Sequence, residues 1–349
     1  MIKAKARAVK GPTDKFESIE IERRDVGPKD VLIDIKFAGI CHSDIHTARG
    51  EWREIEYPFV PGHEIVGIVQ EVGSEVTKHK VGDRVGVGCL VNSCGECEYC
   101  LEGNEHYCKN GSVGTYASHD KYVEGSPLTQ GGYSSHVVVT ENFVLHIPDG
   151  MEMDEAAPLL CAGITTYSPL RHWQAGPGKK VAVLGMGGLG HMAVKLAHAM
   201  GAEVTVLSHS DKKREDAKEF GADHFVNTSE EKELADVKSS FDLIINTISV
   251  NLDVNTYLGL LRPQGTLVNV GAPSEPLSVN VFSLLGGRKS FSGSNIGGIR
   301  ETQEMLDFCA EHSVAPQIEK ITADQIDDAY ERVVNSDVRY RFVIDNATL

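Results

Sequence analysis

Four cysteines lie close together in this chain of 349 residues, and their spacing indicates metal chemistry. Cys94, Cys97, Cys100 and Cys108 are half of the eight cysteines that the chain contains. Four thiolates in one loop can form a tetrahedral shell around Zn²⁺, with Zn–S distances near ~2.3 Å and no open position. Such an ion stabilises a loop that has too few apolar residues to fold alone. The spacing therefore predicts a structural zinc site.

Two other uses of these cysteines are less consistent with the sequence. Disulfides between such close cysteines would strain the geometry, and they belong to oxidising compartments, of which the chain gives no sign. An iron–sulfur cluster would suit the C-x2-C-x2-C run. In bacterial ferredoxins that run continues with x3-C-P, whereas here the last gap is longer and holds no proline.

A second chemical signal is the sequence G-M-G-G-L-G, which follows a predicted strand at 180–184 and begins a predicted helix at 188–200. In this context the first glycine permits a tight turn, the second lets the backbone approach a pyrophosphate, and the third allows close helix packing. The phosphates would lie at the helix N-terminus. Without that context the motif is equally a glycine-rich turn. The predicted cofactor contacts are Gly185, Gly187, Gly188, Leu189 and Gly190.

The end of the next predicted strand, at 203–207, indicates which dinucleotide is bound. NAD sites place a carboxylate there to hold the ribose 2′-hydroxyl. This chain instead has Ser208, His209 and Ser210, followed by a basic stretch that includes Lys213. Hydroxyls and lysines suit a 2′-phosphate, so we expect NADP(H). Asp211 is a nearby carboxylate, and an ordinary helix N-cap with solvated lysines is the alternative interpretation.

Three further residues could form a second metal site. Cys41, His63 and Cys161 would make a Cys₂His zinc site with one open position, as in catalytic zinc sites. The spacing alone does not show that these residues come together. Cys89 and Cys309 are interpreted as core residues, because a free cysteine behaves as a small hydrophobe.

Taken together, these motifs resemble those of the zinc-dependent medium-chain dehydrogenase/reductases, and especially the cinnamyl alcohol dehydrogenase-like enzymes that use NADP. The similarity extends essentially from end to end. It rests on G-I-C-H-S-D-I-H, P-G-H-E-I-V-G, the four-cysteine loop, L-L-C-A-G-I-T-T-Y-S-P-L, the glycine-rich turn and V-R-Y-R-F-V-I-D.

The resemblance implies an α/β fold with two domains and an active site in the cleft between them. A GroES-like β-rich catalytic domain, residues 1–152 and 292–349, would be interrupted by a Rossmann domain with a doubly wound parallel sheet, residues 153–291. Two zinc ions per chain are expected, one catalytic and one structural.

The resemblance also implies roles for individual residues. Glu64 would be an occasional ligand beside Cys41, His63 and Cys161, and Asp44 would orient His63. Ser43 and His46 would form a proton relay that runs through the cofactor ribose. Further contacts are expected from His42 and Thr165 to the cofactor and from Trp52 to the substrate.

The implied reaction is reversible hydride transfer between a primary alcohol and NADP⁺, with aldehyde reduction expected in the cell and a broad range that includes aromatic and medium-chain substrates. A polyol or other secondary-alcohol dehydrogenase of the same superfamily is the nearest alternative. A zinc-containing protein that senses dinucleotides without turnover is another, but it would need no proton relay. We expect a homodimer.

The composition excludes other classes of partner. The net charge of −16 disfavours nucleic acid and an anionic membrane surface. No apolar run is long enough to span a bilayer, and the N-terminus is unlike a signal peptide, so a cytoplasmic enzyme is expected.

The predicted elements agree with two domains. Residues 31–37, 65–72 and 136–139 are strand-like, and the character changes near Met151. Strands then alternate with helices, which predicts a parallel sheet covered on both faces. The alternating elements include a helix at 211–220, a strand at 243–246, a helix that ends at Arg262-Pro263 and a strand at 266–270. After about Phe291 a helix at 301–311 and a final strand at 340–344 are expected.

Overall fold

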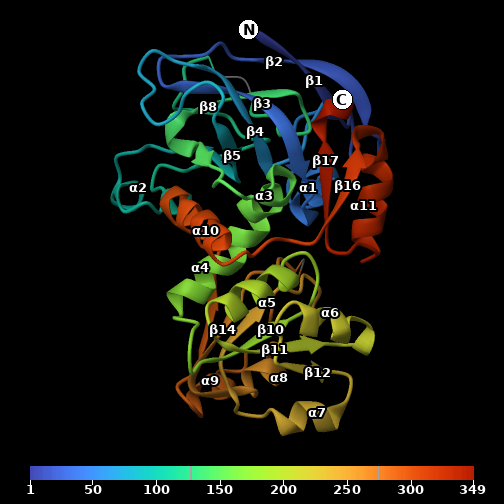
Figure 1. Ribbon diagram of the computed structural model, residues 1–349. Helices are drawn as coiled ribbons and strands as arrows, with labels where there is room; N and C mark the ends of the chain where they lie inside the picture. Colours follow the sequence, from blue (N-terminus) through green and yellow to red (C-terminus); the bar gives the residue numbers. More distant parts are fainter. Residues whose placement is uncertain (126–127, 274) are drawn as a thin grey trace. The chain divides into compact units, whose positions relative to one another are not determined.

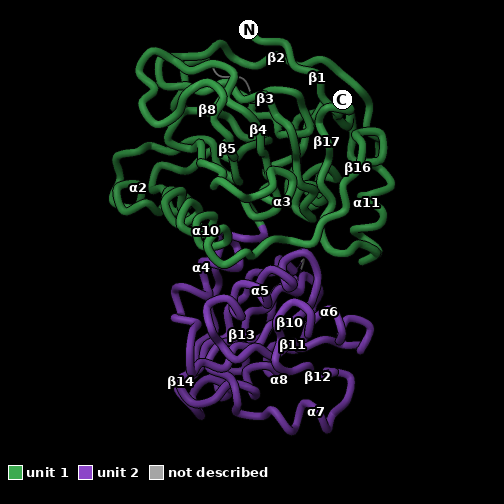
Figure 2. The backbone as a smooth tube through the Cα atoms, viewed as in Figure 1, with its two compact units in different colours: residues 1–161, 297–349 green, residues 162–296 purple. Residues whose placement is uncertain are grey.

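A computed structural model describes residues 1–125, 128–273 and 275–349 of the chain. The chain divides into two compact units, unit 1 with residues 1–161 and 297–349, and unit 2 with residues 162–296 (Figure 2). The domain limits expected from the sequence, after residues 152 and 291, stay a prediction. Among the described residues no helix is long and apolar enough to cross a membrane.

Unit 1 is built around a mostly antiparallel sheet of seven strands (Figure 1). The strands follow the order β16-β17-β3-β4-β5-β9, and β8 also pairs with β3. Their bounds are β3 Asp30–Gly39, β4 Ile65–Val72, β5 Arg84–Val87, β8 His136–Thr140, β9 Leu145–His146, β16 Ile318–Thr322 and β17 Arg341–Asp345. Two smaller pairs join β1 Ile2–Ala8 with β2 Glu17–Arg23 and β6 Leu90–Asn92 with β7 Val113–Gly114.

Short helices connect the strands of unit 1. They are α1 His42–Ala48, α2 Glu98–Leu101, α3 Met153–Pro158, α10 Ile299–Glu311 and α11 Ile326–Val334. The 3₁₀ turns are η1 Glu105–Tyr107, η2 Glu141–Phe143, η5 Ala323–Gln325 and η6 Asn346–Thr348.

The core of unit 1 fixes the place where β3 ends and α1 begins. Phe59, Tyr133 and Phe342 are fully buried in one apolar cluster. Helix α11 adds Ile326 and Tyr330 to that cluster, and Figure 1 shows this helix beside β16 and β17. Removing such large side chains from water is the main favourable term in folding. The start of α1 is therefore held on a rigid base.

Unit 2 contains a parallel sheet of six strands in the order β12-β11-β10-β13-β14-β15. Numbered within the unit, this order is 3-2-1-4-5-6, which is that of the Rossmann fold. The predicted fold class is thereby confirmed. The strand bounds are β10 Lys180–Leu184, β11 Glu203–Ser208, β12 His224–Asn227, β13 Phe241–Asn246, β14 Leu261–Asn269 and β15 Ser290–Gly293.

Strand β10 reads V-A-V-L after its first lysine, and these four side chains are at most 1% exposed. A strand of a parallel sheet is covered on both faces, so it is apolar without alternation. The helical elements of unit 2 are α4 Ile164–His172, α5 Gly190–Ala199, η4 Asp211–Lys213, α6 Arg214–Glu219, α7 Glu231–Asp236, α8 Val254–Leu258 and α9 Val281–Leu285.

One predicted element is wrong. The helix expected to end at Arg262-Pro263 is α8, which ends at Leu258, and Arg262 and Pro263 already belong to β14. The pairing of β13 with β14 shifts register between Phe241 and Leu243. A proline is tolerated at such an irregularity because the ladder of hydrogen bonds is interrupted there.

Candidate metal centres and cofactor-binding turn

The four cysteines of the loop from Cys94 to Cys108 lie at distances that suit one metal ion. Their Sγ–Sγ distances are 3.8 Å for Cys94–Cys100, 3.5 Å for Cys97–Cys100 and 3.4 Å for Cys94–Cys108. A tetrahedron with arms of ~2.3 Å has edges of about 3.8 Å, whereas a disulfide would need about 2.05 Å. The donor set therefore fits a closed zinc shell.

Backbone groups prepare the same loop for a metal. The N–H of Cys97 donates to Cys94 Sγ at 3.4 Å, and the N–H of Cys94 donates to Cys108 Sγ at 3.5 Å. Hydrogen bonds from the backbone N–H groups of Glu96 and Cys97 lower the pKa of Cys94 to about 6, although its partial desolvation opposes the shift. Burial raises the pKa of Cys100 to about 12. Thiolates are the form that binds metal, so the backbone donors favour binding.

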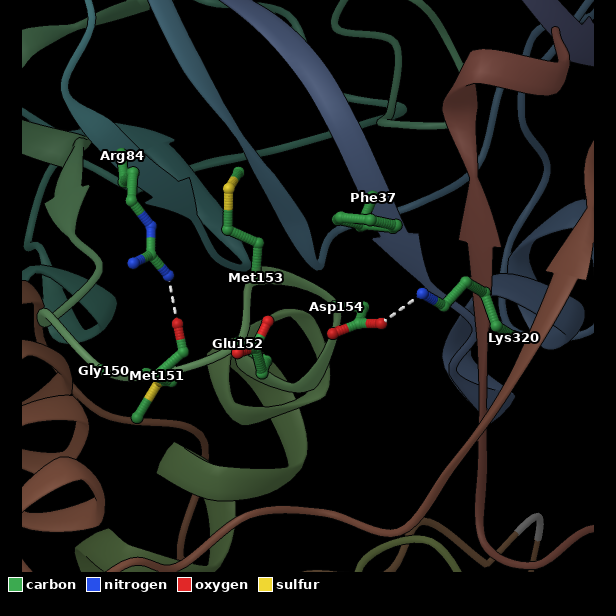
Figure 3. Close-up of a pocket in the computed structure, with 8 residues that line it drawn as sticks. All are labelled: Phe37, Arg84, Gly150, Met151, Glu152, Met153, Asp154 and Lys320. Atoms are coloured by element: carbon green, nitrogen blue, oxygen red, sulfur yellow. Dashed lines mark hydrogen bonds and ion pairs between the residues drawn. The ribbon is translucent and has the colours of Figure 1, made fainter.

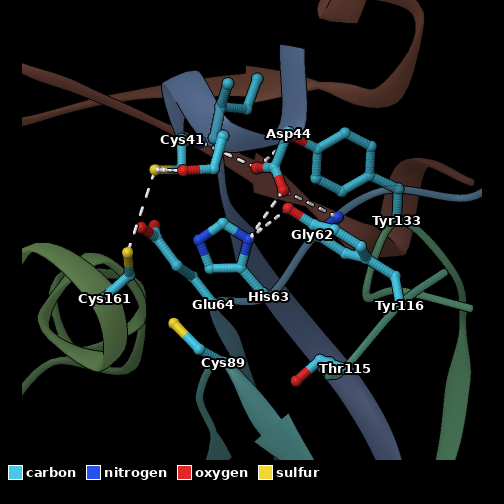
Figure 4. Close-up of polar contacts among 12 residues, drawn as sticks. Cys41, Asp44, Gly62, His63, Glu64, Cys89, Thr115, Tyr116, Tyr133 and Cys161 are labelled. Carbon is cyan, nitrogen blue, oxygen red and sulfur yellow. Dashed lines mark hydrogen bonds and ion pairs between the residues drawn. The ribbon is translucent and has the colours of Figure 1, made fainter. Parts of the chain in front are cut away.

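A second set of donors comes from three separated parts of unit 1. Cys41, His63, Glu64 and Cys161 each offer one donor atom, and these atoms lie within 4.8 Å of one another (Figure 4). Cys41 directly precedes α1, and His63 and Glu64 precede β4. Cys161 lies in η3, a π-helical segment at Leu159–Gly163, and π-helical turns are frequent at functional sites. The fold thus brings together residues that spacing alone could not place.

The ring of His63 is oriented by groups on the side opposite the sulfurs. Its Nδ1 lies 3.0 Å from Asp44 Oδ1 and 2.9 Å from the hydroxyl of Tyr116 (Figure 4). A carboxylate only accepts hydrogen bonds, so Nδ1 carries the proton and Nε2 keeps its lone pair. This is the arrangement of a metal-ligating histidine whose other nitrogen is held by a carboxylate.

Glu64 is fully buried and bonded on one side only. Its Oε1 accepts a hydrogen bond of 2.5 Å from Nη2 of Arg341, while Oε2 has no hydrogen-bond partner among the described residues. Burial raises the pKa of this carboxyl, and the Arg341 guanidinium opposes the rise. Gly39 leaves room for it, because a Cβ there would lie 1.9 Å from Oε2. An unpaired buried oxygen beside two sulfurs fits a neighbouring cation.

The two thiols of this site influence each other. Cys41 Sγ and Cys161 Sγ are 3.9 Å apart. Their hydrogen bond lowers the pKa of Cys41 and raises that of Cys161. Cys309 is buried as expected, but Cys89 is partly exposed and shares a hydrogen bond with Cys161, which lowers the pKa of Cys89. The expectation that Cys89 is a core residue is wrong, because Cys89 is only partly buried and lies at the metal centre, just after β5 (Figure 4).

Helix α1 carries the residues expected to transfer a proton. Ser43 Oγ lies 3.7 Å from Cys41 Sγ, next to the metal donors. The ring of His46 stacks between His42, at a centroid distance of 5.1 Å, and Trp52, at 4.8 Å. His46 Nδ1 also contacts the carboxylate of Glu51. Positions three apart share one helix face, so Ser43 and His46 lie on the same side of α1.

In unit 2 the glycine-rich turn has the geometry that its sequence predicts. Gly185 has φ +90°, and its N–H donates to Leu207 O at 2.9 Å. A Cβ on Gly190 would lie 2.2 Å from the carbonyl oxygen of Gly185, whereas one on Gly187 would meet nothing within 4 Å. Gly188 and Leu189 lead directly into α5. The turn is therefore tight at its ends and open in the middle, where a pyrophosphate would lie.

The end of β11 presents hydroxyls and a cation next to this turn. Ser208 and Ser210 are partly exposed and His209 is exposed. Lys213 Nζ donates to Met186 O at 2.7 Å, so its charge lies at the glycine-rich turn. Asp211 is bonded to Arg214 and to Asn227, at 2.5 and 3.1 Å. Thr165 lies buried within α4.

A separate cavity in unit 1 contains none of these residues (Figure 3). Its volume is about 320 Å³, and an ion pair of 2.6 Å between Lys320 and Asp154 lies across it. It is lined by Phe37, Arg84, Gly150, Met151, Glu152, Met153, Asp154 and Lys320.

A parallel sheet with this glycine-rich turn, together with a closed and an open set of zinc donors, defines a zinc-binding dehydrogenase. Comparison with known proteins agrees. Residues 27–149 match the alcohol dehydrogenase GroES-like domain, and residues 188–311 match the zinc-binding dehydrogenase family.

Several known proteins are similar over nearly their whole length. A Bacillus subtilis protein named probable formaldehyde dehydrogenase AdhA is 62% identical, over 96% of this chain and 95% of its own. NADP-dependent alcohol dehydrogenase C 1 of Mycolicibacterium smegmatis is also 62% identical, over 99% and 98%. A cinnamyl alcohol dehydrogenase structure from Sorghum bicolor has a TM-score of 0.96 at 42% identity, over 99% and 98%. The chain belongs to the zinc-dependent medium-chain alcohol dehydrogenases of the cinnamyl alcohol dehydrogenase type.

Sequence reasoning missed the groups that support the open metal centre. Arg341, Tyr116 and Tyr133 hold Glu64, His63 and Asp44, respectively. Arg341 lies within the V-R-Y-R-F-V-I-D motif, but nothing in that motif indicates a contact with Glu64. The roles of the individual site residues stay predictions.

Protein purified without added metal should contain two zinc ions per chain, because two donor sets fit the ion. Changing Cys97→Ser should remove one ion and destabilise the loop, since a closed four-thiolate shell loses a ligand. Elemental analysis measures both. Cys309→Ala, a cysteine outside both sites, should keep two ions. Stoichiometric iron, or one ion in the unchanged protein, would contradict the assignment.

Replacing Arg341 by methionine should leave the buried charge of Glu64 without its partner and cost about 3–5 kcal/mol of unfolding free energy. Adding Glu64→Gln to this variant should recover part of the loss, because the unpaired charge is then removed. Urea denaturation of the two variants measures the difference. Equal stability of the single and double variants would show that the pair does not act as an ion pair.

Proposed function

We propose that this enzyme interconverts primary alcohols and aldehydes by hydride transfer with NADP(H). The observation that carries the proposal is the donor set of Cys41, His63 and Cys161, beside which Ser43 offers a hydroxyl 3.7 Å from Cys41 Sγ. A relative at 62% identity is named an NADP-dependent alcohol dehydrogenase.

The choice of NADP(H) is supported by the surroundings of Asp211. A carboxylate that selects NAD must be free to accept from the ribose hydroxyls. Asp211 instead accepts from Arg214 at 2.5 Å and from Asn227 at 3.1 Å. Hydrogen bonding to Arg214 also lowers its pKa. Ser208 and Lys213 are then the groups that meet the adenosine ribose, and both suit a phosphate. We therefore expect aldehyde reduction in the cell, where the NADP pool is usually reduced.

The residues of unit 1 would bind and orient the reacting oxygen. Zinc held by Cys41, His63 and Cys161 would supply a Lewis acid that polarises a carbonyl or favours alkoxide at neutral pH. NADP(H) supplies the hydride chemistry. Asp44 keeps His63 in the tautomer that binds metal, and Arg341 holds one oxygen of Glu64.

Proton transfer falls to α1. In alcohol oxidation Ser43 accepts the hydroxyl proton of the substrate as it releases its own proton toward His46, and His46 passes that proton to solvent. The side chain of His46 is 24% exposed, and its ring nitrogen already contacts Glu51, so a path to water exists at this end of the helix. Trp52, stacked on His46 and 50% exposed, offers an aromatic surface for the substrate.

We also propose a cytoplasmic homodimer formed through unit 2. Helix α9 presents Val281, Phe282 and Leu285 with exposures of 55%, 76% and 66%, and β15 is an edge strand of the parallel sheet. Exposed apolar side chains next to an open sheet edge are typical of a subunit interface.

The test is turnover of a panel of aldehydes and alcohols with NADPH and NADH in parallel, followed at the nicotinamide absorbance. We expect benzaldehyde, cinnamaldehyde and medium-chain aldehydes to be reduced faster than sorbitol or secondary alcohols are oxidised. A polyol dehydrogenase would show the opposite preference. Binding of NADPH without any turnover would favour the alternative of a zinc-containing protein that senses dinucleotides.

Changing Ser208→Asp should remove the preference for NADPH. A carboxylate at the end of β11 repels a 2′-phosphate, and like charges at an interface cost several kcal/mol, so we expect a fall on the order of 10²-fold in the NADPH/NADH ratio of kcat/KM. Ser239→Asp is the control. Ser239 is exposed and precedes the N-terminal end of β13, whereas Ser208 lies at the C-terminal end of β11. Equal use of NADH by the unchanged enzyme would contradict the assignment.

Changing Ser43→Ala should reduce kcat by roughly 10²–10⁴-fold, which is the usual contribution of general acid–base groups. His46→Gln should cost less, because solvent can partly replace the last proton acceptor. Kinetics, zinc content and melting temperature of both variants are compared. Near-normal kcat in a folded, zinc-loaded Ser43→Ala enzyme would rule out this proton path.

A further inference from the structure

A third group of metal-type donors lies in unit 1 and shares no residue with either cysteine site. It consists of His79, Asp83 and His146, and one donor atom of each lies within 4.8 Å of the others. His79 and Asp83 belong to the loop between β4 and β5. His146 ends β9 and is paired with Val85 of β5. Strand pairing thus brings residues distant in sequence to one place.

Hydrogen bonds fix the tautomers of both histidines. His79 Nε2 lies 3.2 Å from Val144 O, and His146 Nε2 lies 3.1 Å from Lys78 O. A carbonyl oxygen only accepts, so each Nε2 carries the proton and each Nδ1 has a lone pair. A histidine that ligates a metal characteristically donates its other N–H to a carbonyl in this way.

The lone pair of His79 is buried without a partner. His79 is only 7% exposed, and its Nδ1 has no hydrogen-bond partner within the described part of the chain. Within the same part no hydrogen bond reaches Nδ1 of His146. The two rings lie 4.5 Å apart between centroids. A buried acceptor of this kind, next to a second imidazole and a carboxylate, points to a cation.

The surrounding backbone holds the group in position. Glu141 accepts from the N–H groups of Thr77 and Lys78, at 2.9 and 3.0 Å, and so fixes the loop before His79. Gln303 bonds both the N–H and the carbonyl of His146, at 2.9 and 3.0 Å. Asp83 uses Oδ2 to accept from the N–H of Lys80 at 2.9 Å, which leaves Oδ1 available.

We propose that His79, Asp83 and His146 form a binding site for a divalent transition-metal ion of the zinc type. Two imidazoles and one carboxylate suit Zn²⁺ with solvent at the open position, whereas Mg²⁺ and Ca²⁺ prefer oxygen ligands. A bound ion joins the loop between β4 and β5 to strand β9 and stabilises unit 1. The site is independent of the reaction proposed above.

The experiment starts from enzyme that contains its two tightly held zinc ions. The protein is equilibrated with buffered Zn²⁺ and passed through gel filtration in the same buffer, and its zinc content and melting temperature are then measured. We expect a third ion per chain and a higher melting temperature with Zn²⁺, but no shift with Mg²⁺.

His146→Ala should bind the third ion at least on the order of 10²-fold more weakly, because even residues behind a ligand change affinity 10–100-fold. His224→Ala, an exposed histidine of unit 2, should behave as the unchanged enzyme. Asp83→Asn keeps an acceptor for Lys80 and is the second variant if the first does not fold. Turnover of benzyl alcohol should be unchanged in all three variants. A zinc content of two in the unchanged enzyme, or a third ion that both site variants retain, would overturn the proposal.

Discussion

The open metal centre depends on one buried carboxylate, that of Asp44, which is fully shielded from solvent. Its oxygens accept from Cys41 N at 2.8 Å, Gly62 N at 3.2 Å, His63 Nδ1 at 3.0 Å and the Tyr133 hydroxyl at 3.1 Å. A buried charge is tolerated only when it is hydrogen-bonded or paired. These four donors come from three segments of the chain, so satisfying Asp44 also fixes the positions of Cys41 and His63. The same side chain caps α1, which carries Ser43 and His46.

A second buried charge ties the end of the chain to this site. Arg341 in β17 donates to Glu64 and, at 2.8 Å, to the carbonyl of Ile40. Strand β17 pairs with β3 just before α1, with Val343 opposite Gly39. The residues after 296 therefore complete the sheet on which the metal donors rest, and the β-rich unit requires both of its chain segments.

How much could be predicted from the sequence depended on how local each signal is. The four-cysteine loop and the glycine-rich turn are complete within a few residues, and the geometry of each agrees with the pattern. Cys41, His63 and Cys161 are far apart in the chain, so their spacing gave a donor set but no evidence of contact, and the family resemblance supplied it. No local signal came from Arg341, Tyr116 and Cys89. These residues reach the site only once β17, the loop after β7 and the segment after β5, respectively, are folded around it.

The two cysteine sites illustrate a general difference between closed and open zinc centres. A closed site can take all of its ligands from one loop, because nothing needs to be kept away from the ion. An open site must hold three donors while preventing a fourth from closing the shell. Here Glu64 is the nearby fourth donor: Arg341 binds its Oε1 at 2.5 Å, while Oε2 has no partner among the described residues. Because Arg341 belongs to β17, the position of this fourth donor depends on both chain segments of the unit and not on any motif within it.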